Sequence, residues 1–195
     1  MSSSVLSTLR EDLDLGPRGI FRLFTVRSLA VVLVRMATAA GGVHPLLGLL
    51  VKQVNHVLTG ADIAWQAELG PGLRLYHPTG VVIGPYVRVG RDCRLQQGVT
   101  LGGFGGDAEA VDTSPVIGDD VELGSGAKVI GPIMVGDRCR VGANAVVTRS
   151  VPADHVAVGV PARSRPVGGS GGGDPTAEGD VKGDVAAGAA VSTQA

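Results

Sequence analysis

The chain has 195 residues, of which 44% are hydrophobic but only 3% aromatic, and it contains 31 glycines. This length suits one domain with appendages, and a core of small and branched aliphatic residues favours a narrow, repetitive β architecture over a globular sandwich or a helix bundle. The formal net charge of −1, from 17 basic and 18 acidic residues, argues against a nucleic-acid-binding protein.

Residues 1–60 form a segment with a helical pattern. We expect two short helices there, at about 17–39 and 44–58, separated by Gly41-Gly42 and Pro45. The chain opens with the polar, acidic stretch MSSSVLSTLREDLDLG, so we expect no signal peptide and a cytoplasmic location.

The strongly apolar stretch 29–51 raises the question of a membrane. A membrane span needs about 20 apolar residues with few charges, and Arg35 and His44 interrupt this one. We therefore expect the helices to pack on the rest of the protein. Peripheral membrane contact through residues 17–58 is the alternative, because basic residues flank or punctuate the apolar face at Arg18, Arg22, Arg27 and Arg35.

Residues 61–166 repeat with a period of six. From Ile117 the units read IGDDVE, LGSGAK, VIGPIM, VGDRCR, VGANAV and VTRSVP. An earlier run reads IGPYVR, VGRDCR and LQQGVT, and a third, slightly out of frame, reads IAWQAE, LGPGLR and LYHPTG. An aliphatic residue opens each unit and an apolar or small residue occupies most fifth positions. This pattern is typical of hexapeptide β-helices.

The hexapeptide repeat predicts a left-handed parallel β-helix with three units in each triangular coil. Cys93 and Cys139 both occupy the fifth position, so we expect both thiols to be buried and inert. Residues 102–115 hold no repeat unit and should form a loop that projects outward from the stack.

The last segment, 167–195, is rich in Gly, Ala, Asp and Thr and has almost no large apolar residue. It cannot bury enough surface to offset its ordering entropy, so we expect it to be disordered.

Among the four histidines, His77 stands out. It lies in LYHPTG, where the repeat shifts frame and the surface of a coil should be disturbed. His44, His56 and His155 lie in the helical segment or in a terminal turn, where structural or solvated roles are expected.

The run DIAWQAELGPGLRLYHPTGVVIG, followed by QQGVTLGGFGG, GSGAKVIGPIMVGD, GANAVV and VGVPAR, resembles the serine acetyltransferase family over residues 55–165. It is most similar to the short members from exopolysaccharide gene clusters, such as colanic acid acetyltransferases. The resemblance implies acetyl-CoA as cosubstrate, no metal, and a homotrimer whose active sites lie between subunits and are partly covered by the loop.

The resemblance also implies that His77 is the catalytic base and Asp62 its partner. Attack on a thioester requires the acceptor hydroxyl to lose its proton, and a neutral imidazole is a suitable base near pH 7. A carboxylate on the other ring nitrogen would fix the tautomer and stabilise the imidazolium. The fifteen residues between Asp62 and His77 make about one coil, so the two should stack close together.

For coenzyme A, the resemblance implies backbone contacts at Gly103, Ser125 and Ala143, and contact of Arg163 with the nucleotide phosphates.

The acceptor positions depart from the family. Serine-specific members carry Asp before the catalytic histidine and Arg-His before a proline in the loop, whereas this chain has Tyr76, Thr113 and Ser114. A site that left the charges of serine unpaired would lose several kcal/mol, so we expect a neutral acceptor. The chain ends in Gln-Ala rather than in the isoleucine that docks cysteine synthase in the family, so we expect no such binding.

The leading hypothesis is therefore acetyl transfer from acetyl-CoA to a hydroxyl of a sugar or another neutral small molecule, by direct attack. Serine O-acetylation is the alternative. A zinc carbonic anhydrase on the same fold would need three histidine ligands, and only His77 lies in the repeats before the terminal turn. A non-catalytic β-helix scaffold is disfavoured because both Asp62 and His77 are present.

Overall fold

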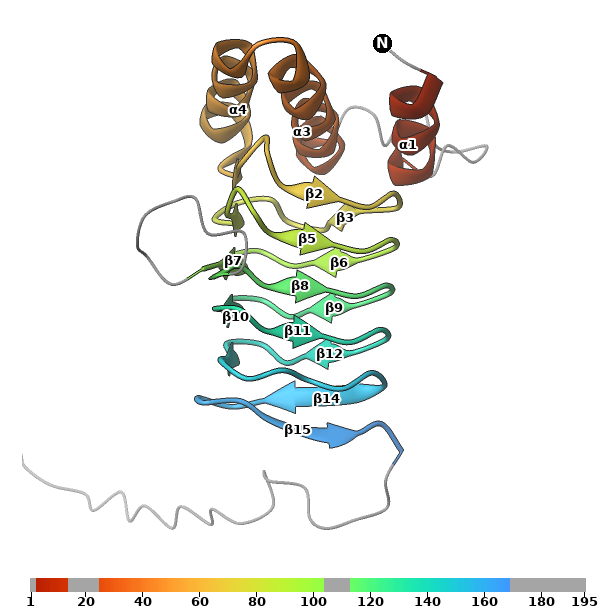
Figure 1. Cartoon of the computed structure of the whole chain (residues 1–195), viewed down its shortest axis with the longest axis vertical. Helices are drawn as coiled ribbons and strands as arrows, with labels where there is room; N and C mark the ends of the chain where they lie inside the picture. Colours follow the sequence, from red (N-terminus) through yellow and green to blue (C-terminus); the bar gives the residue numbers. More distant parts are fainter. Residues whose placement is uncertain (1–2, 14–24, 104–112, 169–195) are drawn as a thin grey trace, which may run out of the picture.

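The computed structural model describes residues 3–13, 25–103 and 113–168. In these ranges the chain forms a stack of three-sided β coils with helices at one end (Figure 1). The predicted loop 102–115 and tail 167–195 lie largely outside the described residues, so the expected disorder of the tail stays a prediction.

The N-terminal segment contains α1 (Ser3–Leu13), α3 (Val26–Val43) and α4 (Pro45–Thr59). His44 separates α3 from α4 and caps α4, because its Nδ1 accepts a hydrogen bond from the backbone N–H of Leu46 at 3.2 Å. Helix α4 ends at Gly60, whose left-handed backbone (φ 75°) suits a glycine.

The expected break at Gly41-Gly42 is wrong, because α3 continues through both glycines to Val43. Gly41 is needed for packing instead: a Cβ there would overlap the ring of Trp65, and one at Gly48 would approach the Gly41 Cα at 2.7 Å. The two glycines therefore let α3, α4 and Trp65 pack closely. The predicted helix start near 17 lies outside the described residues.

A buried ion pair holds α1 and α3 on the first coil. Arg35 Nε donates to Asp12 Oδ2 at 2.8 Å, and the other nitrogens of Arg35 donate to Asp12 Oδ1 and to the carbonyls of Leu69 and Gly70. Asp12 Oδ1 also accepts from the backbone N–H of Leu73 at 3.0 Å. The Asp12 side chain is fully buried.

Three parallel sheets form the sides of the β-helix, as the hexapeptide repeat predicts. The first side consists of β1 (Asp62–Ile63), β4 (Val82–Ile83), β7 (Thr100–Gly102), β10 (Lys128–Ile130) and β13 (Val146–Val147). The second consists of β2 (Glu68–Leu69), β5 (Arg88–Val89), β8 (Val116–Ile117) and β11 (Met134–Val135). The third consists of β3 (Arg74–Leu75), β6 (Arg94–Leu95), β9 (Glu122–Leu123), β12 (Arg140–Val141), β14 (His155–Val158) and β15 (Arg163–Pro166).

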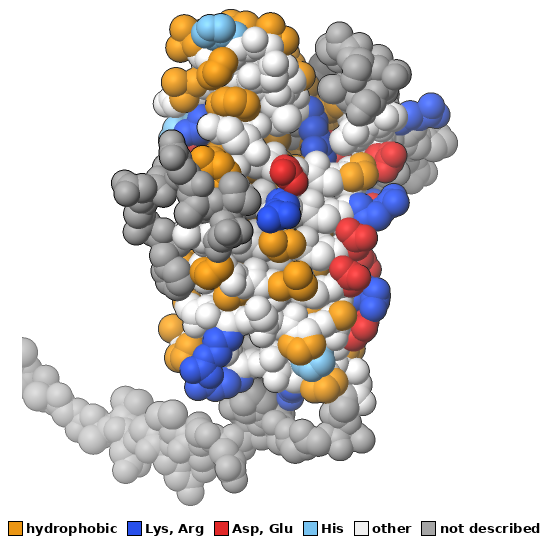
Figure 2. All heavy atoms as spheres, in the orientation of Figure 1, with side chains coloured by type: hydrophobic (Ala, Val, Ile, Leu, Met, Phe, Trp, Pro, Cys, Tyr) orange, Lys and Arg blue, Asp and Glu red, His pale blue; other side chains and the backbone are white. Residues whose placement is uncertain are grey.

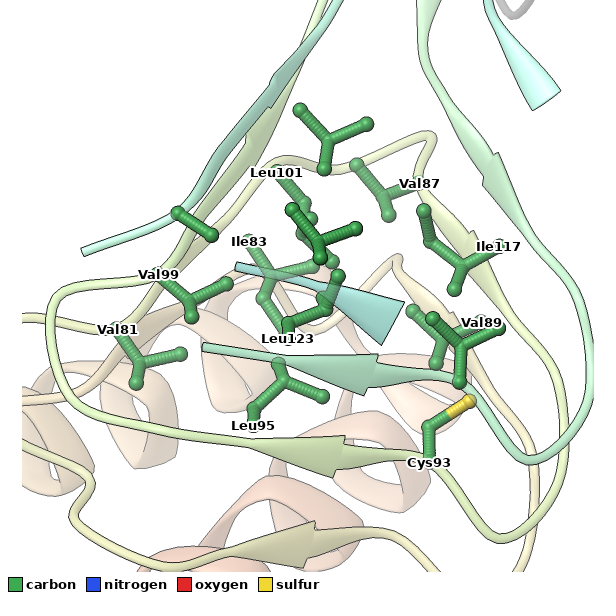
Figure 3. Packing of buried hydrophobic residues seen from close by; sticks show 14 of the residues in the cluster. Val81, Ile83, Val87, Val89, Cys93, Leu95, Val99, Leu101, Ile117 and Leu123 are labelled. Carbon is green, nitrogen blue, oxygen red and sulfur yellow. The ribbon is translucent and has the colours of Figure 1, made fainter. Parts of the chain in front are cut away.

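The aliphatic residues of the repeat fill the interior of the coils (Figure 3). Ile83, Leu101 and Val129 stack along the first side, and their side chains are at most 1% exposed. Cys93 and Cys139 are buried as predicted. The stack ends where β15 pairs antiparallel to β14.

Two places depart from the regular coil. Arg74 of β3 and Val82 of β4 are eight positions apart, whereas Arg94 and Thr100, at the next corner of the same edge, are six apart. The frame shift seen in the sequence is thus a corner two residues longer, and it contains His77. The other departure is the insertion between β7 and β8.

Candidate active site

The long corner around His77 rests on the end of the helical segment. The backbone N–H of Gly80 donates to the carbonyl of Gly60 at 2.9 Å, and that of Gly98 in the next coil donates to Thr79 at 3.1 Å. The His77 side chain is exposed on this corner. The structure therefore places a solvent-exposed imidazole at one edge of the first side.

Asp62 begins β1 beside this corner, and its backbone N–H donates to the carbonyl of Val81 at 2.8 Å. Its half-exposed carboxylate pairs with Lys52 of α4, with Nζ and Oδ1 2.5 Å apart. Within the described residues no hydrogen bond joins Asp62 to His77, so the predicted catalytic pair stays a prediction. Lys52 had no signal in the sequence, because only the fold brings α4 against β1.

Two of the predicted coenzyme A residues, Ser125 and Ala143, lie on the same edge as His77 in later coils. Successive corners of this edge are linked by backbone hydrogen bonds of 2.8–3.1 Å. In each, an N–H of one coil donates to a carbonyl of the coil before it: Gly98 to Thr79, Gly126 to Gln97, and Asn144 to Ser125. Gly98 and Gly126 follow these corners with φ near 70°, a region that favours glycine. The edge therefore forms a continuous column of hydrogen-bonded corners that leads away from His77 past Ser125 and Ala143.

The predicted contacts Gly103, Thr113 and Ser114 lie at the opposite edge of the first side. Gly103 follows β7, and a Cβ on it would meet the carbonyl oxygen of Thr113 at 2.8 Å, so the two ends of the loop meet here. Ser114 is buried beside them. Six residues per side at about 3.3 Å each put the two edges roughly 15–20 Å apart. One chain therefore does not bring Thr113 and Ser114 together with His77.

The last coil carries a basic cavity of about 220 Å³, lined in part by Arg149, Arg163 and Ser164. Arg163 lies near the His77 edge, because it pairs with Val158 at the end of β14, whereas Arg149 follows β13 and so lies on the Gly103 edge. Arg163 was expected to contact phosphates. Arg149 was missed, since its repeat unit VTRSVP shows nothing beyond a surface turn.

A second cavity, of about 210 Å³, lies between α1, α3 and β3 and is lined by Arg27, Arg74 and Tyr76 together with neighbouring residues. The Arg27 guanidinium stands 5.1 Å from the centre of the Tyr76 ring. No described carboxylate forms an ion pair with Arg27 or Arg74. Tyr76 was predicted to contact the acceptor substrate. Arg27 and Arg74 were not predicted, because they come from segments that only folding brings together.

The described residues offer little other reactive chemistry. Burial raises the pKa of the Cys93 thiol to about 11 and also raises the pKa of Cys139. Within the same ranges, no cluster of three or more His, Cys, Asp or Glu side chains is placed to hold a metal ion.

Comparison with known proteins adds to this geometry. Residues 114–149 match the family model described as bacterial transferase hexapeptide (six repeats). A curated serine acetyltransferase of Mycobacterium tuberculosis is 46% identical over 116 residues, which cover 60% of this chain and 50% of the relative. The chain thus spans about half the length of the curated relatives it matches most strongly.

Solved structures are similar over more of the chain. The crystal structure of Neisseria gonorrhoeae serine acetyltransferase matches with a TM-score of 0.77 and 30% identity, covering 84% of this chain and 67% of that one. A serine acetyltransferase in complex with CoA matches with a TM-score of 0.73 and 30% identity, covering 83% and 70%. These names do not single out the exopolysaccharide-cluster members expected from the sequence.

Proposed function

This chain belongs to the serine acetyltransferase family of hexapeptide-repeat transferases, and we propose that it transfers an acetyl group from acetyl-CoA to an acceptor hydroxyl. The observation that carries the proposal is the edge of the β-helix on which an exposed histidine is followed, coil by coil, by the corners that carry Ser125 and Ala143. The left-handed winding expected from the repeat is consistent with the family.

In this proposal the donor lies along the His77 edge. Backbone groups at Ser125 and Ala143 contact the pantetheine arm, and Arg149 and Arg163 bind phosphates. Two guanidiniums in one cavity suit phosphate oxygens, because each can donate a bidentate pair of hydrogen bonds.

His77 acts as the general base. It removes the acceptor proton as the hydroxyl oxygen attacks the thioester carbonyl, the C–S bond then breaks, and the imidazolium returns the proton to the departing thiolate. Asp62 stabilises the imidazolium from its place beside the corner. Lys52 competes for this carboxylate, so Asp62 is shared between the two cations.

We propose L-serine as the acceptor to test first. The relatives named above are serine acetyltransferases, and the expectation of a neutral acceptor finds no support among them. The cavity beside Tyr76 offers a physical reason, because Arg27 and Arg74 line it, while the carboxylate of Asp12, which also lines it, is paired with Arg35. Arg27 and Arg74 would hold the serine carboxylate in place of the missing loop residues.

A neutral acceptor stays the second candidate because of Tyr76, Thr113 and Ser114, none of which carries a charge. Since Thr113 and Ser114 lie at the opposite edge of one chain from Tyr76 and His77, a site that uses all four needs a neighbouring subunit. We therefore also propose the homotrimer, which light scattering would test.

An acceptor screen tests the proposal. Release of CoA thiol is followed with L-serine and with neutral sugars, and the product is identified by mass spectrometry. Saturable formation of O-acetylserine is expected, and R27A/R74A should raise the KM for serine at least tenfold. Acetylation of a sugar in preference to serine would select the second candidate, and release with no acceptor would reject the transferase.

A further inference from the structure

Helix α4 buries small and polar side chains and exposes large aliphatic ones, which is the reverse of the usual arrangement in an amphipathic helix. Its small and polar residues Gly48, Asn55 and Thr59 are buried. Seven large aliphatic side chains are exposed: Leu46, Leu47, Leu49, Leu50, Val54, Val57 and Leu58. At 100° per residue they cover about half of the helix circumference. A face of this kind marks an interaction surface.

Helix α3, which packs against α4, exposes four more large apolar side chains: Val26, Leu29, Met36 and Val43. Together these eleven residues, which we call the apolar hairpin face, account for most of the large hydrophobic side chains exposed in the described residues. The hairpin stands at one end of the β-helix, beyond the first coil, and apolar side chains gather over it (Figures 1 and 2).

The charges of this region are all basic. Residues 15–61 contain Arg18, Arg22, Arg27, Arg35 and Lys52 but neither Asp nor Glu. Of these, Arg35 is drawn inward to Asp12 and Lys52 to Asp62, away from the apolar face. No carboxylate in this stretch would be repelled by an anionic surface or have to be desolvated on it.

The chemistry of the face fits lipid better than protein. It consists of Leu, Val and one Met, whereas the residues that dominate protein interfaces are Trp, Tyr and Arg. Helix α3 has the length and composition of a span, but 39% of it is buried and Arg35 ties it to the first coil.

We propose that the apolar hairpin face docks on the surface of a lipid bilayer that contains anionic lipid. The leucines and valines enter the boundary between headgroups and acyl chains, and the excess of basic over acidic residues in 15–61 attracts the anionic headgroups. The hairpin lies on the membrane rather than crossing it. This inference does not depend on the proposed acetyl transfer.

The experiment is vesicle flotation of the full chain, with phosphatidylcholine vesicles and with vesicles that also contain phosphatidylglycerol. The test variant is L46S/L50S, and the matched control M134S/V167S removes two exposed apolar residues far from the hairpin. Light scattering gives the mass of each protein in solution, and circular dichroism verifies its fold.

The wild type and the control should bind the anionic vesicles, and L46S/L50S should partition at least tenfold less at unchanged mass. Absence of binding by the wild type, or equal binding by L46S/L50S, would overturn the proposal. A lower mass of L46S/L50S, with no vesicle binding by the wild type, would instead make the face a contact between copies of the chain.

Discussion

The buried pair Asp12–Arg35 gives the sharpest stability prediction. The change D12N keeps the shape of the side chain but removes its charge, and its amide NH2 cannot accept from the guanidinium. Arg35 then keeps the two backbone carbonyls and the amide oxygen of Asn as acceptors but loses the carboxylate, in a place where its side chain is 9% exposed. Removing one partner of a buried ion pair typically costs about 3–5 kcal/mol.

The matched control is D154N, which makes the same chemical change in an exposed pair. Asp154 and Arg138 are 58% and 56% exposed, so solvent screens their attraction and the expected loss is below about 1 kcal/mol. Asn also tolerates the left-handed backbone of this position (φ 60°).

Urea denaturation at fixed protein concentration measures both variants. With a slope of about 2 kcal/mol per M, D12N should lower the midpoint by about 1.5–2.5 M, and D154N by less than about 0.5 M. Hydrogen exchange should show α1 losing protection first. Equal midpoints for D12N and D154N would refute the claim that this pair holds α1 and α3 on the first coil.

Three further predictions follow from local geometry. Burial raises the pKa of Cys93 to about 11, so at pH 8 the folded chain holds about 100-fold less thiolate at this position than an ordinary cysteine would. Labelling of Cys93 by Ellman's reagent should therefore require unfolding, and rapid labelling of the native protein would contradict this. G41A should lower the thermal midpoint, because its Cβ overlaps the ring of Trp65, whereas G42A should raise stability by about 0.5–1 kcal/mol, since its Cβ meets nothing within 4 Å; equal shifts would argue against the close helix packing. R149A/R163A should weaken CoA binding in calorimetry at least tenfold, an effect that R138A, another exposed arginine, should not share.

Much of the fold was readable from the sequence because the repeat imposes it. The aliphatic period of six fixed which residues point inward, and the frame shift at LYHPTG located the long corner that displays His77. The helix boundaries were less accessible. Two adjacent glycines, Gly41 and Gly42, predict the end of a helix. The helix continues through them, because Trp65, 24 residues later, packs so closely that only glycine fits at position 41.

The site was only partly predictable for a related reason. Asp62, His77, Ser125 and Ala143 lie on or beside one edge, because residues one coil apart stack and their spacing is visible in the sequence. Lys52 and Arg27 carry no such period, and only the docking of α3 and α4 brings them to β1 and to Arg74 of β3. The residues at the base of the loop occupy the other edge, where one chain alone cannot complete the site.

The central claim, that His77 is the base of an acetyltransferase, is tested most directly by turnover of acetyl-CoA in the presence of L-serine. H77A should lower turnover by about 10²- to 10⁴-fold with binding of CoA unchanged. H56A, which removes an exposed histidine of α4, should stay within about twofold of the wild type. Equal turnover by H77A and the wild type would contradict the account.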